Sequence, residues 1–270
     1  MSVSPSDARF AGSVPTLYDE HLAPVCLAPF AGDLAARVPG ASGTRLLETA
    51  CGTGVATRRL LERLPADGRI TATDLNEDML AVFRAKVPAD ARLVWRQADA
   101  QDLPFADGAF DAVACQFGVM FYPDKPRGLR EARRVLRSGG RFVFNTWLPL
   151  EANPVQRVAR DVIEGYFEDD PPLFYRTPFS WSDAGEVRET LLQAGFVEAR
   201  VTPVEAEGTC VSHRSLAIGF VRGNPILHAI EERRVDPDVV VSAVEARLRE
   251  LWPGAPFRVP MRALVAEAVA

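Results

Sequence analysis

Short strand-like and helix-like segments alternate between residues 45 and 147, and this alternation constrains the fold more than any other feature. Five apolar runs have the composition of buried strands: 45–49, 69–73, 92–96, 110–115 and 141–146. Helical patterns occur at 55–64, 77–87 and 125–136. Strand and helix alternation with short connections predicts an α/β fold, in which helices cover both faces of a mostly parallel sheet.

The chain beyond Trp147 has a different character. Residues 148–182 combine several prolines with many aromatic residues, and a long segment of this kind in a compact domain is typical of a lid over a binding site. A helix over 183–194 and a strand over 196–203 are predicted next. We expect 260–269 to form the last strand of a seven-stranded sheet, antiparallel beside 196–203.

These patterns divide the chain into a helical cover, a sheet domain and an insertion. Residues 1–40 are expected to form the cover. The sheet domain comprises 41–203 and 260–270, with the lid at 148–182 inside it. The stretch 204–259 is expected to be a mostly helical insertion.

The cover contains helix breakers. Apolar residues recur at helix-like spacing from Thr16 to Val38, but Pro24, Pro29 and Gly32 interrupt the pattern. Because proline disrupts a helix interior, we expect several short helices here rather than one continuous helix.

Composition and charge exclude several classes of function. The chain of 270 residues is 47% hydrophobic, which is enough for a complete core. Its net charge of −5 disfavours nucleic acid as a partner, because duplex-binding surfaces need a basic excess. No signal peptide is recognisable, nor an apolar run of the roughly 20 residues that span a bilayer. We therefore expect a cytoplasmic protein, monomeric or homodimeric, without a membrane partner.

No metal site is predicted. None of the four cysteines belongs to a Cys-x-x-Cys pair, and the three histidines are scattered along the chain. Structural zinc sites cluster such ligands at short spacings. The cysteines are expected to be reduced and to pack as small apolar side chains.

The turn at Ala50–Gly54 is the central chemical signal. It joins a predicted strand to a predicted helix through the sequence ACGTG. Glycines allow a ligand to lie against the backbone, and the free N–H groups of the following helix can bind a carboxylate or phosphate. Asp74 follows Gly54 by 20 residues, at the end of the next predicted strand, and an acid in that position binds ribose hydroxyls in nucleoside-binding sheets.

The turn does not match a dinucleotide site. The fingerprint G-x-G-x-x-G/A would place a small residue where this chain has Thr57. Glu48 would also bring negative charge toward a pyrophosphate, whereas a carboxylate suits a ligand that carries an ammonium or sulfonium group.

At this point the chain resembles the class I S-adenosylmethionine (SAM)-dependent methyltransferases, and within them the bacterial group that includes the ubiquinone/menaquinone-type C-methyltransferases. The resemblance covers about 45–147 strongly and the rest weakly. Four elements in order carry it: ETACGTG at 48–54, TDLNEDML at 73–80, QADAQDLPF at 97–105 and REARRVLRSGGRF at 130–142.

The resemblance implies SAM as cofactor and names the residues that hold it. Gly52, Thr53 and Gly54 would pack on its methionine part, with Glu48 and Ala50 in the same turn. Further contacts are implied for Asp74 at the ribose, Leu75 and Met79 around adenine, Asp99 and Ala100 at the adenine edge, and Gln116 near the methionyl group. Simpler interpretations remain open: Asp74 as a helix cap, Met79 as core filler and Asp99 as a turn residue.

A methyltransferase that acts on a small apolar or aromatic molecule is therefore the predicted function. Methyl transfer from a sulfonium needs alignment and exclusion of water, and the sequence shows no dedicated base. Either alignment alone is sufficient, or one of four candidate bases contributes: Tyr18, His21, Tyr122 or Tyr175. The predicted acceptor pocket is walled by Tyr18, Phe117, Met120, Trp147 and Tyr175.

Two alternatives share these sequence features. A SAM-binding protein that transfers no methyl group, such as a regulator or a cyclase-like relative, would carry the same cofactor elements. A nicotinamide-dependent oxidoreductase would also have a glycine-containing turn after its first strand, but Glu48 and Thr57 disfavour it.

Overall fold

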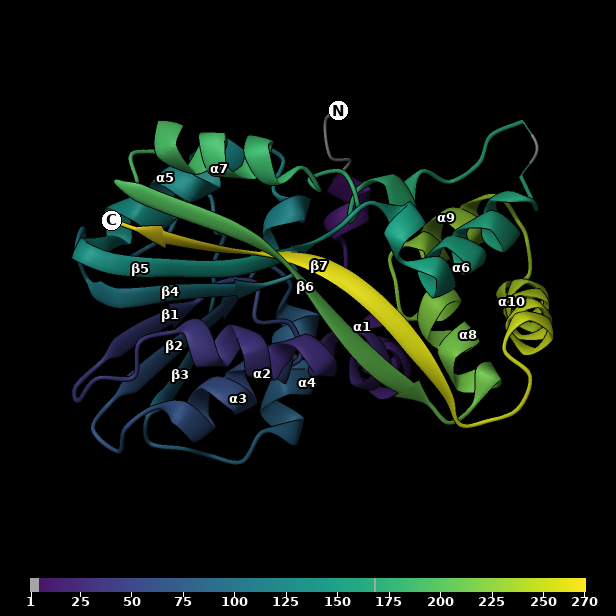
Figure 1. Ribbon diagram of the computed structural model, residues 1–270. Helices are drawn as coiled ribbons and strands as arrows, with labels where there is room; N and C mark the ends of the chain where they lie inside the picture. Colours follow the sequence, from purple (N-terminus) through teal and green to yellow (C-terminus); the bar gives the residue numbers. More distant parts are fainter. Residues whose placement is uncertain (1–4, 168) are drawn as a thin grey trace.

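A twisted sheet of seven strands runs through the molecule, in the order β3-β2-β1-β4-β5-β7-β6 (Figure 1). The computed structural model describes residues 5–167 and 169–270; residues 1–4 of the expected cover and residue 168 of the expected lid lie outside the described residues. The strands are β1 Arg45–Glu48, β2 Arg69–Asp74, β3 Leu93–Gln97, β4 Phe110–Gln116, β5 Leu136–Trp147, β6 Glu198–Cys210 and β7 Phe257–Val269.

Strands β1 to β5 are parallel, and β7 is antiparallel to both of its neighbours, β5 and β6. The predicted seven-stranded sheet with a C-terminal antiparallel strand is therefore confirmed. The last two strands are longer than the sequence pattern predicts, since they pair from Glu198 with Val269 to Cys210 with Phe257. Their outer halves leave the sheet and run under the helices beside it, where Phe257, Val259 and Met261 of β7 are buried.

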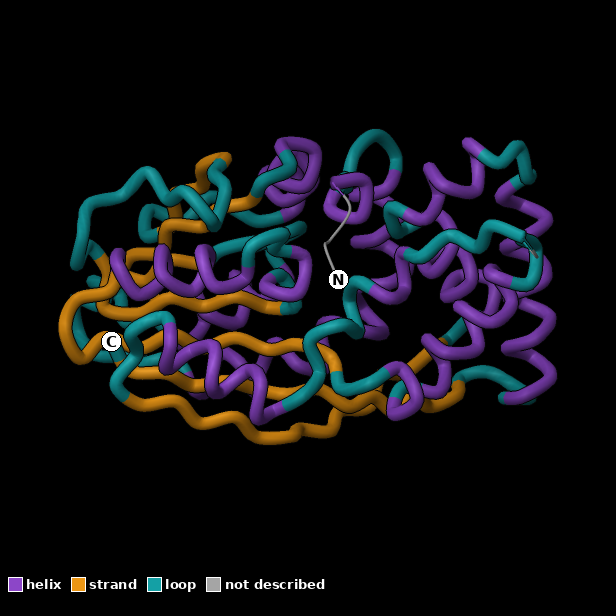
Figure 2. Tube along the Cα trace, turned by 90° about the horizontal axis from the view of Figure 1, so that it is seen from above, coloured by secondary structure: helices purple, strands orange, loops and turns teal. Residues whose placement is uncertain are grey.

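Helices cover both faces of the sheet (Figure 2). On one face lie α2 Ala28–Arg37, α3 Val55–Arg63 and α4 Glu77–Lys86, whose buried side chains form one apolar core with β1 and β2. On the other face lie α5 Lys125–Val135 and α7 Ala184–Gln193, which form a second core with β4 and β5. Two-sided burial explains the apolar runs LL, VAC and FVF in the strands.

A third core lies beside the sheet, around the outer half of β7. It is built by η2 Tyr18–Leu27, α6 Pro154–Glu164, α8 His213–Arg222, α9 Ile226–Glu232 and α10 Pro237–Leu251. The short turns η1 Pro5–Ala8, η3 Val119–Phe121, η4 Leu150–Ala152 and η5 Phe174–Arg176 complete the helical elements of the described residues. This helical layer faces the carboxyl ends of the parallel strands (Figure 1).

The N-terminal helix corrects one expectation. Helical structure continues without a break from α1 Val14–Leu17 through η2 into α2, so the predicted series of short separate helices is wrong. The segment η2 has π-helical hydrogen bonds, including the one from the Ala28 N–H to the Ala23 carbonyl. Its wider turn accommodates Pro24. Pro29 stands at the junction where the π-helical segment passes into α2.

Within the described residues, no helix has the length and apolar character that would be needed to cross a membrane. The four cysteines are free and buried.

Replacing Phe144 with alanine should destabilise the protein by about 3–5 kcal/mol, because a fully buried ring leaves a cavity. Phe144 is 0% exposed, and its ring stacks on that of Trp181 at 5.7 Å. Urea unfolding measures the change, with Val211→Ala as control, since Val211 is 74% exposed and such surface changes stay within about 0.5 kcal/mol. A loss no larger than that of the control would contradict the assigned core.

Candidate functional site

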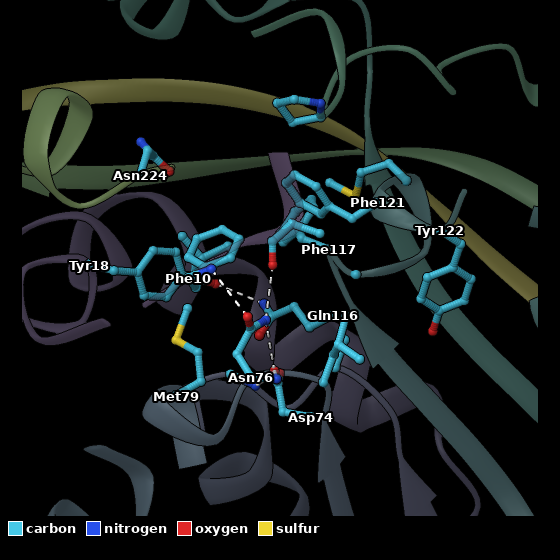
Figure 3. Close-up of a pocket in the computed structure, with 18 of the residues that line it drawn as sticks. Phe10, Tyr18, Asp74, Asn76, Met79, Gln116, Phe117, Phe121, Tyr122 and Asn224 are labelled. Atoms are coloured by element: carbon cyan, nitrogen blue, oxygen red, sulfur yellow. Dashed lines mark hydrogen bonds between the residues drawn. The ribbon is translucent and has the colours of Figure 1, made fainter. Parts of the chain in front are cut away.

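A cavity of about 340 Å³ lies between the carboxyl ends of the parallel strands and the helical layer (Figure 3). Open α/β sheets bind ligands at this edge, and the volume lies within the range of about 300–1,000 Å³ that is usual for small-molecule sites. The ends of β1, β2 and β4 supply one wall, and η2, α6 and α8 supply residues of the other. Asp74 and Asp99, both carboxylates, are the charged side chains among the lining residues that the structure describes.

The turn after β1 presents bare backbone to the cavity. Gly52 has a φ of +56°, and a Cβ added to it would meet nothing within 4 Å. Gly54 also has a positive φ, of +82°, but a Cβ there would collide with the Phe83 ring at 2.5 Å. Gly52 therefore leaves room for a ligand, whereas Gly54 lets helix α4 pack closely against the turn.

Asp74 ends β2 and is bound to that same turn. Its Oδ2 accepts a hydrogen bond from the Gly52 N–H at 2.9 Å, and its Oδ1 accepts one from the Asn76 N–H at 2.8 Å. Burial raises the pKa of this carboxyl, although these N–H groups oppose the shift. A carboxylate has about four lone-pair positions, so Asp74 retains capacity to accept further hydrogen bonds from a ligand in the cavity.

The neighbouring wall contains the other residues that the sequence assigns to cofactor binding. Leu75, Met79, Asp99 and Ala100 line the cavity together with Ala50 and Gln116. The Asp99 Oδ1 accepts a hydrogen bond from the Gln101 N–H at 2.8 Å, which fixes the carboxylate. The Gln116 Nε2 donates to the Leu27 carbonyl at 2.9 Å, which ties the end of β4 to η2.

Glu48, Thr53 and Gly54 do not line the cavity. Glu48 is 1% exposed, and its Oε2 accepts a hydrogen bond from the Thr57 Oγ1 at 2.6 Å. Burial raises the pKa of Glu48 to about 8, against the opposing effect of that hydrogen bond. Its side chain therefore joins β1 to α3 beneath the turn. The Thr53 Oγ1 is buried without a hydrogen-bond partner.

The far end of the cavity is aromatic. The Phe117 ring stacks on the Trp147 ring at 4.0 Å with an angle of 10° between their planes, and Phe30 packs edge-on against both. Phe117 has a φ of +50°, and its N–H donates to the Asn145 Oδ1 at 2.9 Å. All the residues assigned to the acceptor pocket from sequence line the cavity: Tyr18, Phe117, Met120, Trp147 and Tyr175.

The candidate bases are in different surroundings. The Tyr122 and Tyr175 hydroxyls are buried; Tyr122 lies 3.2 Å from the Thr49 Oγ1, and Tyr175 donates to the Phe220 carbonyl at 3.3 Å. Burial raises the pKa of both phenols, and burial together with the nearby Asp74 raises that of Tyr18. His21 does not line the cavity, because its Nδ1 is paired with the Ser215 Oγ of α8 at 2.8 Å.

Residues 8–12, here called the N-terminal strap, are hydrogen-bonded beside Asp74 at one end of the cavity; from the sequence they were assigned only to the helical cover. The Phe10 N–H donates to the Asn76 Oδ1 at 3.2 Å, and the Asn76 Nδ2 donates to the Ala8 carbonyl at 3.1 Å (Figure 3). The Gly12 N–H donates to the Asp78 Oδ2 at 2.8 Å. Asn76 and Asp78 both lie in TDLNEDML, so the only available signal was their position directly after Asp74.

Other lining residues were not named individually from the sequence. Phe121, Phe174, Gln156 and Asn224 reach the cavity from segments far apart in the chain. Gln156 and Phe174 lie within the predicted lid 148–182, whereas nothing in the local sequence distinguishes Asn224 from an ordinary turn residue.

Known proteins resemble this chain in sequence. Residues 47–144 match a family model described as a methyltransferase domain. A demethylmenaquinone methyltransferase of Clavibacter sepedonicus is 33% identical over 182 residues, which cover 67% of this chain and 71% of the relative.

The chain belongs to the class I SAM-dependent methyltransferases. SAM is accordingly the cofactor of this methyltransferase. This membership removes the nicotinamide-dependent alternative.

Solved structures share the methyltransferase fold. A phosphoethanolamine N-methyltransferase 2 of Haemonchus contortus, in complex with phosphomonomethylethanolamine and S-adenosylhomocysteine, aligns with a TM-score of 0.60 at 16% identity, over 97% of this chain and 59% of that one. The cyclase SpnF aligns with a TM-score of 0.54 at 22% identity, over 90% and 80% of the two chains. Similarity at this level concerns the fold alone.

Replacing Glu48 with glutamine should change how stability depends on pH. Between pH 4.5 and about 8, the unfolded chain loses the Glu48 proton while the folded protein keeps it. The contribution of Glu48 to stability is therefore complete at low pH and is lost as the pH rises through about 8. The unfolding free energy of the variant relative to the wild type should rise by about 1.4 kcal/mol per pH unit in this window.

Urea unfolding at pH 5 to 8 measures this difference. Glu62→Gln, the same change at an exposed position on α3, is the matched control, because the Glu62 side chain is 59% exposed. A pH-independent difference for Glu48→Gln would mean that Glu48 is ionised in the folded protein.

Proposed function

We propose that this methyltransferase transfers the methyl group of SAM to a small apolar or aromatic molecule. The observation that carries the proposal is the asymmetry of the cavity. One end has bare glycine backbone and two carboxylates, and the other has stacked aromatic rings (Figure 3). A cationic sulfonium cofactor suits the first end, and an apolar planar acceptor suits the second.

The cofactor end fits SAM residue by residue. The open backbone at Gly52 would receive the methionine part, and Asp74 would accept the ribose hydroxyls with its remaining lone pairs. Leu75 and Met79 would enclose the adenine, with Asp99 at its edge. Glu48, Thr53 and Gly54 would support the turn from behind, since they lie outside the cavity.

The lining of the cavity favours a small apolar acceptor. Apart from Asp74 and Asp99, the described residues that line it are uncharged, and many of them are aromatic. The relative from Clavibacter sepedonicus is named for demethylmenaquinone, and a planar quinone-type ring suits the Phe117–Trp147 wall. Described residues of the cover, the lid and helix α8 line the cavity and would enclose such a ligand.

Positioning rather than base catalysis would accelerate the reaction. When bound, the cofactor supplies a methyl group that is already activated on a sulfonium sulfur. The aromatic wall would align the acceptor and exclude water. Burial raises the pKa of Tyr18, Tyr122 and Tyr175, so these phenols would hold their protons at neutral pH and act as hydrogen-bond donors.

Asp74→Ala should weaken the binding of S-adenosylhomocysteine, the product form of the cofactor. The loss of a charge-assisted contact of about 1.5–3 kcal/mol corresponds to an increase in Kd of about ten- to 150-fold. Isothermal titration calorimetry gives the Kd directly. Asp107→Ala is the control, because the Asp107 side chain is 82% exposed. Equal affinity in the wild type and Asp74→Ala would remove Asp74 from the site.

Methyl transfer should be detectable with simple aromatic acceptors. We expect label from methyl-labelled SAM to appear in 1-naphthol or a naphthoquinol, and not in 1-naphthyl phosphate, because the charged residues of the cavity are carboxylates. Mass spectrometry identifies the product and the methylated atom. Transfer to the phosphate ester in preference to the naphthol would argue against an apolar acceptor pocket.

A further inference from the structure

Two buried side-chain amides line the cavity, and an entirely apolar acceptor would leave them without a role. Gln156 lies on α6, and Asn224 lies in the turn between α8 and α9. Both line the cavity, and both are buried, with 4% and 7% of their surface exposed. Buried polar groups in proteins normally have a hydrogen-bond partner, so the nitrogen and the oxygen of each amide are both expected to be paired.

Asn224 is oriented by the end of helix α8. Its Nδ2 donates to the Gly219 and Phe220 carbonyls, both at 3.3 Å. The Phe220 carbonyl also accepts a hydrogen bond from the Tyr175 Oη. Because the amide nitrogen is committed to the helix, the Oδ1 is the atom left for the cavity, and it accepts no hydrogen bond within the part of the chain that the structure describes. Figure 3 shows the Asn224 oxygen on the side toward the cavity.

In Gln156, as in Asn224, the amide oxygen is the atom without a hydrogen-bond partner among the described residues. Its Nε2 makes a long contact with the Cys26 Sγ, at 4.0 Å. Its Oε1 is fully buried and has no hydrogen-bond partner. Helix α6 and the turn after α8 thus place two carbonyl-type oxygens at one cavity: the Gln156 Oε1, which is buried and unpaired, and the Asn224 Oδ1. Oxygens of this type accept hydrogen bonds but cannot donate them.

We propose that Gln156 and Asn224 select the methyl acceptor by accepting hydrogen bonds from it. The acceptor is then an apolar or aromatic molecule that carries hydroxyl or N–H groups, and not a pure hydrocarbon, an ether or a fully oxidised quinone. A donor on the ligand satisfies the buried oxygens, whereas a ligand without one leaves them unpaired, and sites built this way discriminate strongly. The inference deepens the proposed function and rests on it.

Binding in the presence of S-adenosylhomocysteine tests the inference without turnover. The probes share one ring and differ in their donors: 2,7-dihydroxynaphthalene, 7-methoxy-2-naphthol and 2,7-dimethoxynaphthalene. The proteins are the wild type, Gln156→Met, which keeps the side-chain length without the amide, and Gln193→Met, the same change at an exposed position on α7. Calorimetry gives the Kd of each probe, and the Kd of S-adenosylhomocysteine reports whether each variant is folded.

We expect the wild type and Gln193→Met to bind the dihydroxy probe at least tenfold more tightly than the dimethoxy probe. Gln156→Met should keep its affinity for S-adenosylhomocysteine and lose most of this preference. Equal binding of the three probes by the wild type, no binding of any probe, or an unchanged preference in Gln156→Met would overturn the proposal. If Gln156→Met fails to bind S-adenosylhomocysteine, Gln156→Leu takes its place with the same expected loss.

Failure of the proposed function would look different. In that case the donor preference is present in binding, but the wild type transfers no methyl group from SAM to any of the hydroxylated probes.

Discussion

The hydrogen bond between the Asp74 carboxylate and the Gly52 N–H connects the two strand ends on which the site depends. It holds the turn after β1 against the end of β2, so the bare backbone and the carboxylate face one cavity. Asn76 extends the same link, since its N–H binds Asp74 and its side chain binds the strap at Ala8 and Phe10. The turn after β1, Asp74 and the N-terminal strap are thus connected by one set of hydrogen bonds.

Charge and apolar character are separated along the cavity. Asp74 and Asp99 lie at the cofactor end, and the stacked pair of Phe117 and Trp147 lies at the other. Glu48, which the sequence places beside the cofactor, is instead buried against Thr57, where burial raises its pKa. The Glu48 carboxyl joins β1 to α3 through Thr57. It lies outside the cavity, so it does not place a second carboxylate beside Asp74 there.

Much of the site could be predicted because its residues lie next to one another in the chain or at strand ends. Parallel strands in one sheet bring their carboxyl ends to one edge, so Gly52, Asp74, Asp99 and Gln116 meet by topology alone. The stacked pair of Phe117 and Trp147 could be predicted to lie at this edge, because Phe117 directly follows β4 and Trp147 is the last residue of β5. The continuous helix at the N-terminus could not be predicted. The expectation that proline interrupts a helix applies to an isolated helix, whereas η2 is packed against α8.

The sequence by itself determined the sheet, the glycine turn and the place of Asp74 at the end of β2, since these follow from local apolar patterns and from short motifs. Only the tertiary structure decided the roof of the cavity. Phe10, Gln156 and Asn224 come from three distant segments, and their polar or aromatic character acquires meaning only when helices pack over the strand ends. The Gln156 Oε1 is the clearest example. Whether it has a hydrogen-bond partner depends on which residues the fold places around it, and the sequence alone does not show these neighbours.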